Sequence, residues 1–155
     1  MRRVVILAQL PDPSALRGAL GDSDGCVISL TAWLSEQLDD ADITSRPVSD
    51  YVEIEDWEDF HAELWRALAG QAGSAPPSIP PWLHDWSHFL ADELRADFYW
   101  ARVAQRIVEL EAPMELMIQR VSPQDGSAGG LSALAAAFDL LGQRWSYWEP
   151  SPDYE

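Results

Sequence analysis

The sequence contains a single cysteine, no lysine and no hydrophobic run long enough to cross a membrane. One cysteine excludes a disulfide within the chain, and Cys26 lies in an apolar run where we expect a buried small residue rather than a nucleophile. The apolar run near the N-terminus ends at Leu10 and Pro11 without the small residues of a signal-peptide cleavage site. We therefore expect a cytoplasmic protein with no direct membrane insertion.

Basic residues are scarce. The chain has ten arginines and 26 acidic residues, which gives a formal net charge of −16. A high-GC genome explains the use of arginine in place of lysine, and a salt-adapted host is the second explanation. The negative field repels phosphate backbones and anionic membranes, so we expect no nucleic-acid binding. The opposite relation, in which the acidic chain mimics nucleic acid and occupies a basic partner, stays open.

Glycine-rich phosphate-binding motifs are missing as well. The first predicted strand is followed by Gln9-Leu10-Pro11-Asp12-Pro13, where a dinucleotide-binding protein carries Gly-x-Gly-x-x-Gly. Without those glycines the backbone cannot approach a pyrophosphate closely. The chain also lacks a P-loop and a Gly-x-Ser-x-Gly elbow. We expect no cofactor, and no complete catalytic site identifies a reaction, so whether the protein is an enzyme stays open.

The feature that organises the rest of the chain is the run of five apolar residues from Val4 to Ala8. A continuous run without alternation is typical of a strand covered by helices on both faces. Further strands are predicted at 26–30, 43–48, 114–121 and 144–149, and helices at 15–20, 31–38, 56–68, 82–110 and 131–141. Pro47 and the alternating pattern of 144–149 favour edge positions for those two strands.

This order of elements is the doubly wound α/β pattern with an enlarged middle crossover. Right-handed crossovers then predict a Rossmann-like three-layer fold, in which a mostly parallel five-stranded sheet has the order 3-2-1-4-5. We expect residues 1–155 to form a single domain with a tryptophan-rich helical insert at about 55–111. The predicted helix 82–110 is longer than a small domain needs, so we expect a break or bend near Ala96-Asp97.

Ligands of open α/β sheets bind beyond the carboxyl ends of the strands, where the direction of winding reverses. Position alone selects six candidate ligand-binding residues after the first, second and fourth strands: Gln9, Asp12, Thr31, Gln119, Arg120 and Ser122. Arg120 is the only cation among them and would meet an anionic ligand. The loop 126–130 can present N–H groups to a phosphate or sugar at a helix start, although a flexible connection is the more ordinary interpretation.

Two histidines, His84 and His88, are four residues apart on one predicted helix face, with Asp92 one turn further. That spacing can place two imidazoles on one metal ion, as in the zinc-protease helix. Asp85 stands where the general-base glutamate of that motif would be, and no third ligand follows downstream. We therefore predict no metal site, and these histidines remain the weak candidate for one.

The eight tryptophans are the most unusual compositional feature, and the helical insert contains five of them: Trp57, Trp65, Trp82, Trp86 and Trp100. The first interpretation is that these rings fill space between the insert and the sheet. A protein interface and sugar stacking are the alternatives, with Trp82, Trp86 and Trp100 as the candidates.

Three segments together carry a family resemblance: Val4-Val5-Ile6-Leu7, Cys26-Val27-Ile28-Ser29-Leu30 and the stretch from Asp42 to Tyr51. Followed by the tryptophan-rich insert, they resemble the N-terminal Rossmann-like domain of bacterial surface-polysaccharide (GT-B-type) glycosyltransferases and related proteins. The likeness covers nearly the whole chain and lies in pattern. In that family the C-terminal domain typically holds the nucleotide-sugar donor, and the N-terminal domain faces the acceptor.

The resemblance implies an acceptor-side domain of a glycosyltransferase-like protein of bacterial surface carbohydrate biosynthesis. The chain would be either a fragment of a longer enzyme with a C-terminal donor-binding domain or a free-standing relative. The alternative from another class is a non-enzymatic acidic protein-interaction module, which binds a protein partner or a second copy of itself through the aromatic helical insert.

Overall fold

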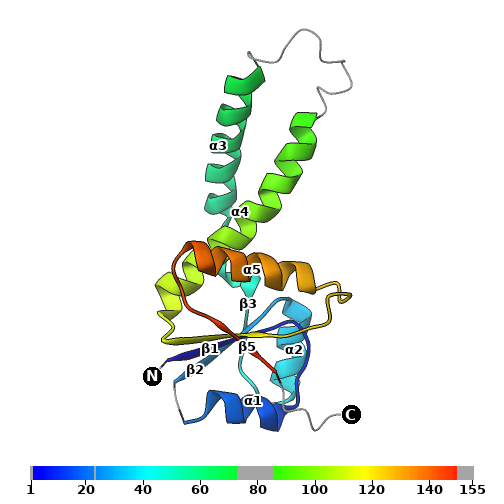
Figure 1. Ribbon diagram of the computed structural model, residues 1–155, viewed down its shortest axis with the longest axis vertical. Helices are drawn as coiled ribbons and strands as arrows, with labels where there is room; N and C mark the ends of the chain where they lie inside the picture. The colour runs from blue at the N-terminus through cyan, green and yellow to red at the C-terminus, as the bar shows by residue number, and fades with distance from the viewer. Residues whose placement is uncertain (1, 23, 73–85, 150–155) are drawn as a thin grey trace. The chain divides into compact units, whose positions relative to one another are not determined.

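The computed structural model describes residues 2–22, 24–72 and 86–149, without the side chains of residues 65, 67–72 and 86–93. Five parallel strands form one sheet in the order β3-β2-β1-β4-β5 (Figure 1). The strands are β1 Arg3–Leu7, β2 Gly25–Ser29, β3 Arg46–Pro47, β4 Glu115–Gln119 and β5 Ser146–Trp148. The predicted α/β class and strand order are confirmed, and the sheet is parallel throughout.

The helices are α1 Pro13–Leu20, α2 Ala32–Asp40, the 3-10 helix η1 Val48–Tyr51, α3 Ile54–Ala72, α4 Trp86–Glu111 and α5 Ala128–Leu140. Figure 1 shows α1 and α2 on one face of the sheet and α5 on the other. None of the described helices is long and apolar enough to cross a membrane.

The central strand β1 is buried on both faces, which explains its unbroken apolar run. Val5 and Leu7 belong to a hydrophobic cluster with Leu16 of α1 and Leu34 of α2. The intervening Val4 and Ile6 point to the opposite face, because side chains alternate along a strand, and both are fully buried. No position from Val4 to Leu7 faces solvent, so no polar residue interrupts this part of the strand.

The two edge strands are short. Only Arg46 and Pro47 of the predicted strand 43–48 pair with β2, and the chain turns into η1 directly afterwards. The strand order places β3 at the edge of the sheet, which confirms the edge position predicted from Pro47. Proline lacks the N–H that would continue the ladder. At the other edge β5 pairs with β4 over three residues and buries only Trp148.

By its internal contacts the chain divides into two compact units, residues 1–51 with 100–155 and residues 52–99. The second unit contains an aromatic cluster, in which Trp57 stacks on Tyr99 with ring centroids 5.7 Å apart and Phe60 stacks on Phe98 at 4.1 Å. These half-buried rings therefore pack against one another within the helical unit.

Helix α4 remains helical through Ala96 and Asp97, so it has no break there. The segment contains neither glycine nor proline, the usual causes of a sharp kink, and the helical hydrogen-bond ladder has no reason to stop. The structure describes this helix from Trp86 onward, and the earlier part of the predicted helix, 82–85, lies outside the described residues.

Candidate ligand pocket at the carboxyl end of the sheet

Gln119, the last residue of β4, joins the two central strands where they end. Its side chain is buried, with only 4% of the residue exposed. The Oε1 atom accepts hydrogen bonds from the backbone N–H groups of Ala8 and Gln9, each at 2.9 Å. A side chain thus continues the pairing of β1 with β4 beyond the backbone ladder, at the point where the winding of the sheet reverses.

The amide nitrogen of Gln119 is left for another partner. Because two N–H donors hold Oε1, the orientation of the amide is determined, and Nε2 donates to no residue in the described part of the chain. Gln119 lines a pocket of about 670 Å³ between the ends of β4 and β5 and the start of α5. The lining includes Gln119, Arg120, Gly129, Leu131, Ser132 and Tyr147.

Arg120 and Tyr147 form one wall of the pocket. The guanidinium carbon of Arg120 lies 4.4 Å from the centroid of the Tyr147 ring, a cation–π geometry. The Nε atom of Arg120 also lies 2.8 Å from a carboxylate oxygen of Glu149, so the positive charge is offset. Both charged side chains are more than half exposed, and a pair of this kind contributes little to folding. Its effect is to hold the arginine against the ring.

The loop between β4 and α5 is tied to the exit of β1 through Asp125. This carboxylate accepts hydrogen bonds from the side chain of Gln9 and from both the hydroxyl and the backbone N–H of Ser127. The bonds from Ser127, followed by the bond from Gln9, lower the pKa of Asp125. The loop 126–130, interpreted from sequence as a flexible connection, therefore has defined hydrogen bonds at its start.

Helix α5 begins at Ala128, earlier than the predicted Leu131, and this brings Gly129 into its first turn. Ser127 at the N-cap makes no side-chain cap, since its hydroxyl donates to Asp125 instead. No described residue accepts a hydrogen bond from the N–H of Gly129, which lines the pocket. This N–H and the Gln119 amide are thus unused donors on residues that line the pocket.

The other residues that were selected by position serve mainly local structure. Asp12 is the N-cap of α1 and accepts from Ala15 N at 2.9 Å, while Thr31 is the N-cap of α2. Neither of these two described residues lines the pocket. Ser122 accepts from the backbone N–H of Gln124 at 3.3 Å and lies in the exposed turn after β4.

Most of the aromatic and histidine candidates lie outside the described side chains: Trp82, His84, Trp86 and His88. Trp100 is described and half-buried, and its ring packs against Gly130 of α5, where an added Cβ would approach the ring to 2.9 Å. In the described part of the chain, no three His, Cys, Asp or Glu side chains are grouped as metal ligands.

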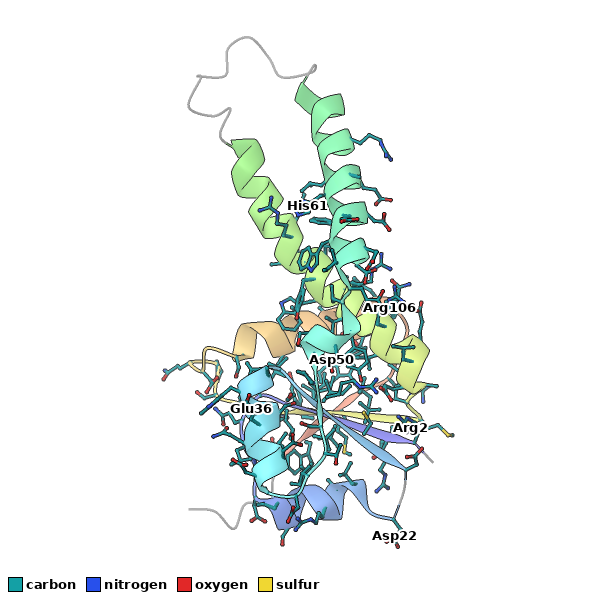
Figure 2. All side chains as sticks on the ribbon, turned by 180° about the vertical axis from the view of Figure 1, so that it is seen from behind. Arg2, Asp22, Glu36, Asp50, His61 and Arg106 are labelled. Carbon is teal, nitrogen blue, oxygen red and sulfur yellow. The ribbon has the colours of Figure 1, made fainter. Side chains whose placement is uncertain are left out.

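A cluster of charged and polar side chains surrounds one buried carboxylate, and the sequence contains no local pattern that predicts it. Glu111, the last residue of α4, is 4% exposed and accepts hydrogen bonds from Tyr51 OH at 2.7 Å and Arg46 Nη1 at 3.2 Å. It also pairs with Arg2 (labelled in Figure 2). Burial by itself would raise the pKa of Glu111, but the hydrogen bonds from Tyr51 and Arg2 and the arginine charges outweigh it, so the pKa is lowered.

Cys26 lies beside this cluster and is half-buried. Burial raises the pKa of its thiol, and the negative charge of Glu111 adds to the effect. A thiol with a raised pKa stays protonated near neutral pH and is a poor nucleophile. We therefore assign the cluster a structural role: it ties the end of α4 to Arg2, just before β1, and to β3 and η1.

No protein-family model, curated protein or solved structure matches this chain. The fold defines the class of the protein, an α/β domain with a Rossmann-like parallel sheet.

Proposed function

We propose that this chain is the N-terminal, acceptor-side domain of a glycosyltransferase-like protein of bacterial surface carbohydrate biosynthesis. The observation that carries the proposal is the pocket at the carboxyl end of β4. It combines the ring of Tyr147, 52% exposed, with the Gln119 amide and the Ser132 hydroxyl. An apolar wall with a few convergent polar groups is the usual composition of a small-molecule site, and an amphipathic ring suits the C–H face of a sugar.

The end of the central strand supports an acceptor rather than a nucleotide-sugar donor. The turn after β1 has no glycine, and the two backbone N–H groups at its start, those of Ala8 and Gln9, are already bonded to Gln119. A pyrophosphate needs free N–H groups and close access to the backbone at this position. The donor would therefore be held by another domain, as the family resemblance implies.

Ligand-observed NMR on the full chain tests this assignment. We expect saturation transfer to neutral oligosaccharides and none to UDP-glucose or GDP-mannose under the same conditions. Transfer to the nucleotide sugars in preference to the saccharides, or to neither class, would contradict the acceptor-side role.

The second candidate is an interaction module that pairs with a second copy through its helical unit. Two apolar side chains of this unit favour it, since Ile54 is 74% and Leu94 is 43% exposed. Light scattering would then detect a dimer that the Ile54→Ser, Leu94→Ser variant loses. A wild-type chain that remains monomeric at every concentration tested would rule this candidate out.

A further inference from the structure

We infer that the pocket selects a neutral, hydroxyl-rich ligand such as a hexopyranoside, and that the amide of Gln119 positions it by donating a hydrogen bond to a ligand oxygen. This inference rests on the proposed function and adds to it the class of sugar and the residue that determines specificity.

The hydrogen-bonding capacity of the pocket is the first argument. Gln119 is almost fully buried, its oxygen is taken by two backbone donors, and only its NH2 group is available to a ligand. The N–H of Gly129, another lining residue, is a further available donor. Gly129 is exposed and Gln119 lines the pocket, so both donors can bind water in the free protein, and a ligand that supplies acceptor oxygens replaces that water.

The charges around the pocket are the second argument, and they disfavour an anion. The one arginine on the lining, Arg120, is paired with Glu149 at 2.8 Å, and the loop beside the pocket carries Asp125. The chain as a whole has a net charge of −16. A phosphate or carboxylate would lose hydration and meet an already neutralised cation in a negative field. A hydroxyl group accepts from Gln119 and carries no charge.

The size and walls of the pocket agree with a sugar. A volume of about 670 Å³ lies within the range of roughly 300–1,000 Å³ that is typical of small-molecule sites. Leu131 and the ring of Tyr147 supply apolar surface, and Ser132 adds a hydroxyl. One pyranose or two linked pyranoses would be held by polar groups on one side and apolar groups on the other.

The decisive variant is Gln119→Glu. A carboxylate at this position still accepts hydrogen bonds from the N–H groups of Ala8 and Gln9, so the ends of β1 and β4 stay joined, but it offers no donor to a ligand. The matched control is Gln124→Glu, which makes the same change of charge at an exposed loop position outside the pocket lining. We expect the affinity for neutral methyl glycosides to fall by about tenfold or more in Gln119→Glu and to stay within about twofold in the control.

The probes are the methyl glycosides of glucose, galactose and mannose, with glucuronic acid and glucose 6-phosphate as anionic counterparts. The NMR spectrum of the wild type tests the same contact without depending on whether a variant folds. We expect the side-chain amide resonances of Gln119 and the backbone amide of Gly129 to shift on addition of a neutral glycoside.

The outcomes separate the two proposals. Neutral glycosides that bind equally well to wild type and Gln119→Glu, or that leave both amide resonances unmoved, overturn the inference and leave the acceptor-side role intact. Tighter binding of the anionic sugars than of the neutral glycosides also overturns the inference and leaves the acceptor-side role intact. Absence of binding by every saccharide overturns the proposed function itself.

Discussion

Glu111 has partners from two separate segments of the chain, Arg2 in one and Arg46 with Tyr51 in the other. Removal of the carboxylate in Glu111→Ala leaves the Tyr51 hydroxyl and two guanidinium groups without their acceptor. Because both arginines remain partly exposed and can turn to water, we expect a loss of about 1.5–3 kcal/mol in the free energy of unfolding. Urea denaturation measures it. Glu109→Ala, an exposed position on the same helix, is the control and should change stability little.

The lowered pKa of Glu111 predicts a pH dependence with a definite sign. A carboxyl group whose pKa is lower in the folded state stabilises the fold above its unfolded pKa, about its ordinary value of 4.5, and this contribution is lost as the pH falls through the folded pKa. At pH 7 we expect wild type to be more stable than Glu111→Gln, and the difference to shrink as the pH falls below 4.5. Thermal unfolding of both proteins between pH 7 and pH 3 measures it. A difference that stays constant would show that the charge of Glu111 contributes nothing.

Gln119 and Glu111 differ in how far the sequence could reveal them. Gln119 ends a strongly apolar strand, and the ends of neighbouring parallel strands meet at one edge of a sheet, so its position followed from the order of elements. Glu111 is close in sequence to none of its partners, and its burial depends on where the last turn of α4 meets the sheet. Periodicity does not contain that information, because a helix end that carries a glutamate is normally exposed.

Among the elements, the starts of α1 and α2 show why position alone is an incomplete guide to a site. Asp12 and Thr31 lie where ligands bind in this class of fold, yet their oxygens cap helices. We expect Asp12→Ala to lower the free energy of unfolding by about 0.5–2 kcal/mol and Asp12→Asn, which keeps a capping oxygen, to lower it much less. Urea denaturation compares the two. Saccharide binding should be the same in both variants. Weaker saccharide binding by either variant would show that Asp12 belongs to the ligand site.

The contact between α5 and α4 within the first unit depends on the absence of a side chain at Gly130. A methyl group there would come to 2.9 Å from the ring of Trp100, so we expect Gly130→Ala to destabilise the fold by about 1–3 kcal/mol. Gly18 of α1 is the matched control because nothing lies within 4 Å of a Cβ built there. Gly18→Ala should stabilise the protein by about 0.4–1 kcal/mol through helix propensity. Equal effects of the two substitutions in thermal unfolding would contradict the close approach.

The elements themselves were predictable to different degrees for physical reasons. Buried strands such as β1 have continuous apolar runs, and helices have caps and stripes, so both leave local signals. The extent of an edge strand depends on pairing, and β3 ends where Pro47 has no N–H to donate. The continuity of α4 through Ala96 and Asp97 follows from the absence of helix-breaking residues, which matters more than the length of the helix.

At the scale of the whole molecule the dominant property is the net charge of −16. Exposed carboxylates occur on many parts of the surface, including Asp22, Glu36 and Asp50 (Figure 2). Their mutual repulsion opposes the compact state, and salt weakens it, since the Debye length falls from about 30 Å at 0.01 M to about 10 Å at 0.1 M ionic strength. We therefore expect the melting temperature at pH 7 to rise with sodium chloride over this range, by roughly 2–4 °C for each kcal/mol gained.

Measurement near the sequence isoelectric point separates this cause from general effects of salt. At about pH 4.3 the net charge approaches zero, and the same addition of sodium chloride should leave the melting temperature nearly unchanged. A melting temperature that falls with salt at pH 7 would mean that attractive pairs such as Arg120–Glu149 outweigh the overall repulsion.

The negative field of the chain also acts on ligands. Neutral glycosides should bind with little dependence on ionic strength, whereas a basic protein partner, as expected of a nucleic-acid mimic, would be released as salt is added.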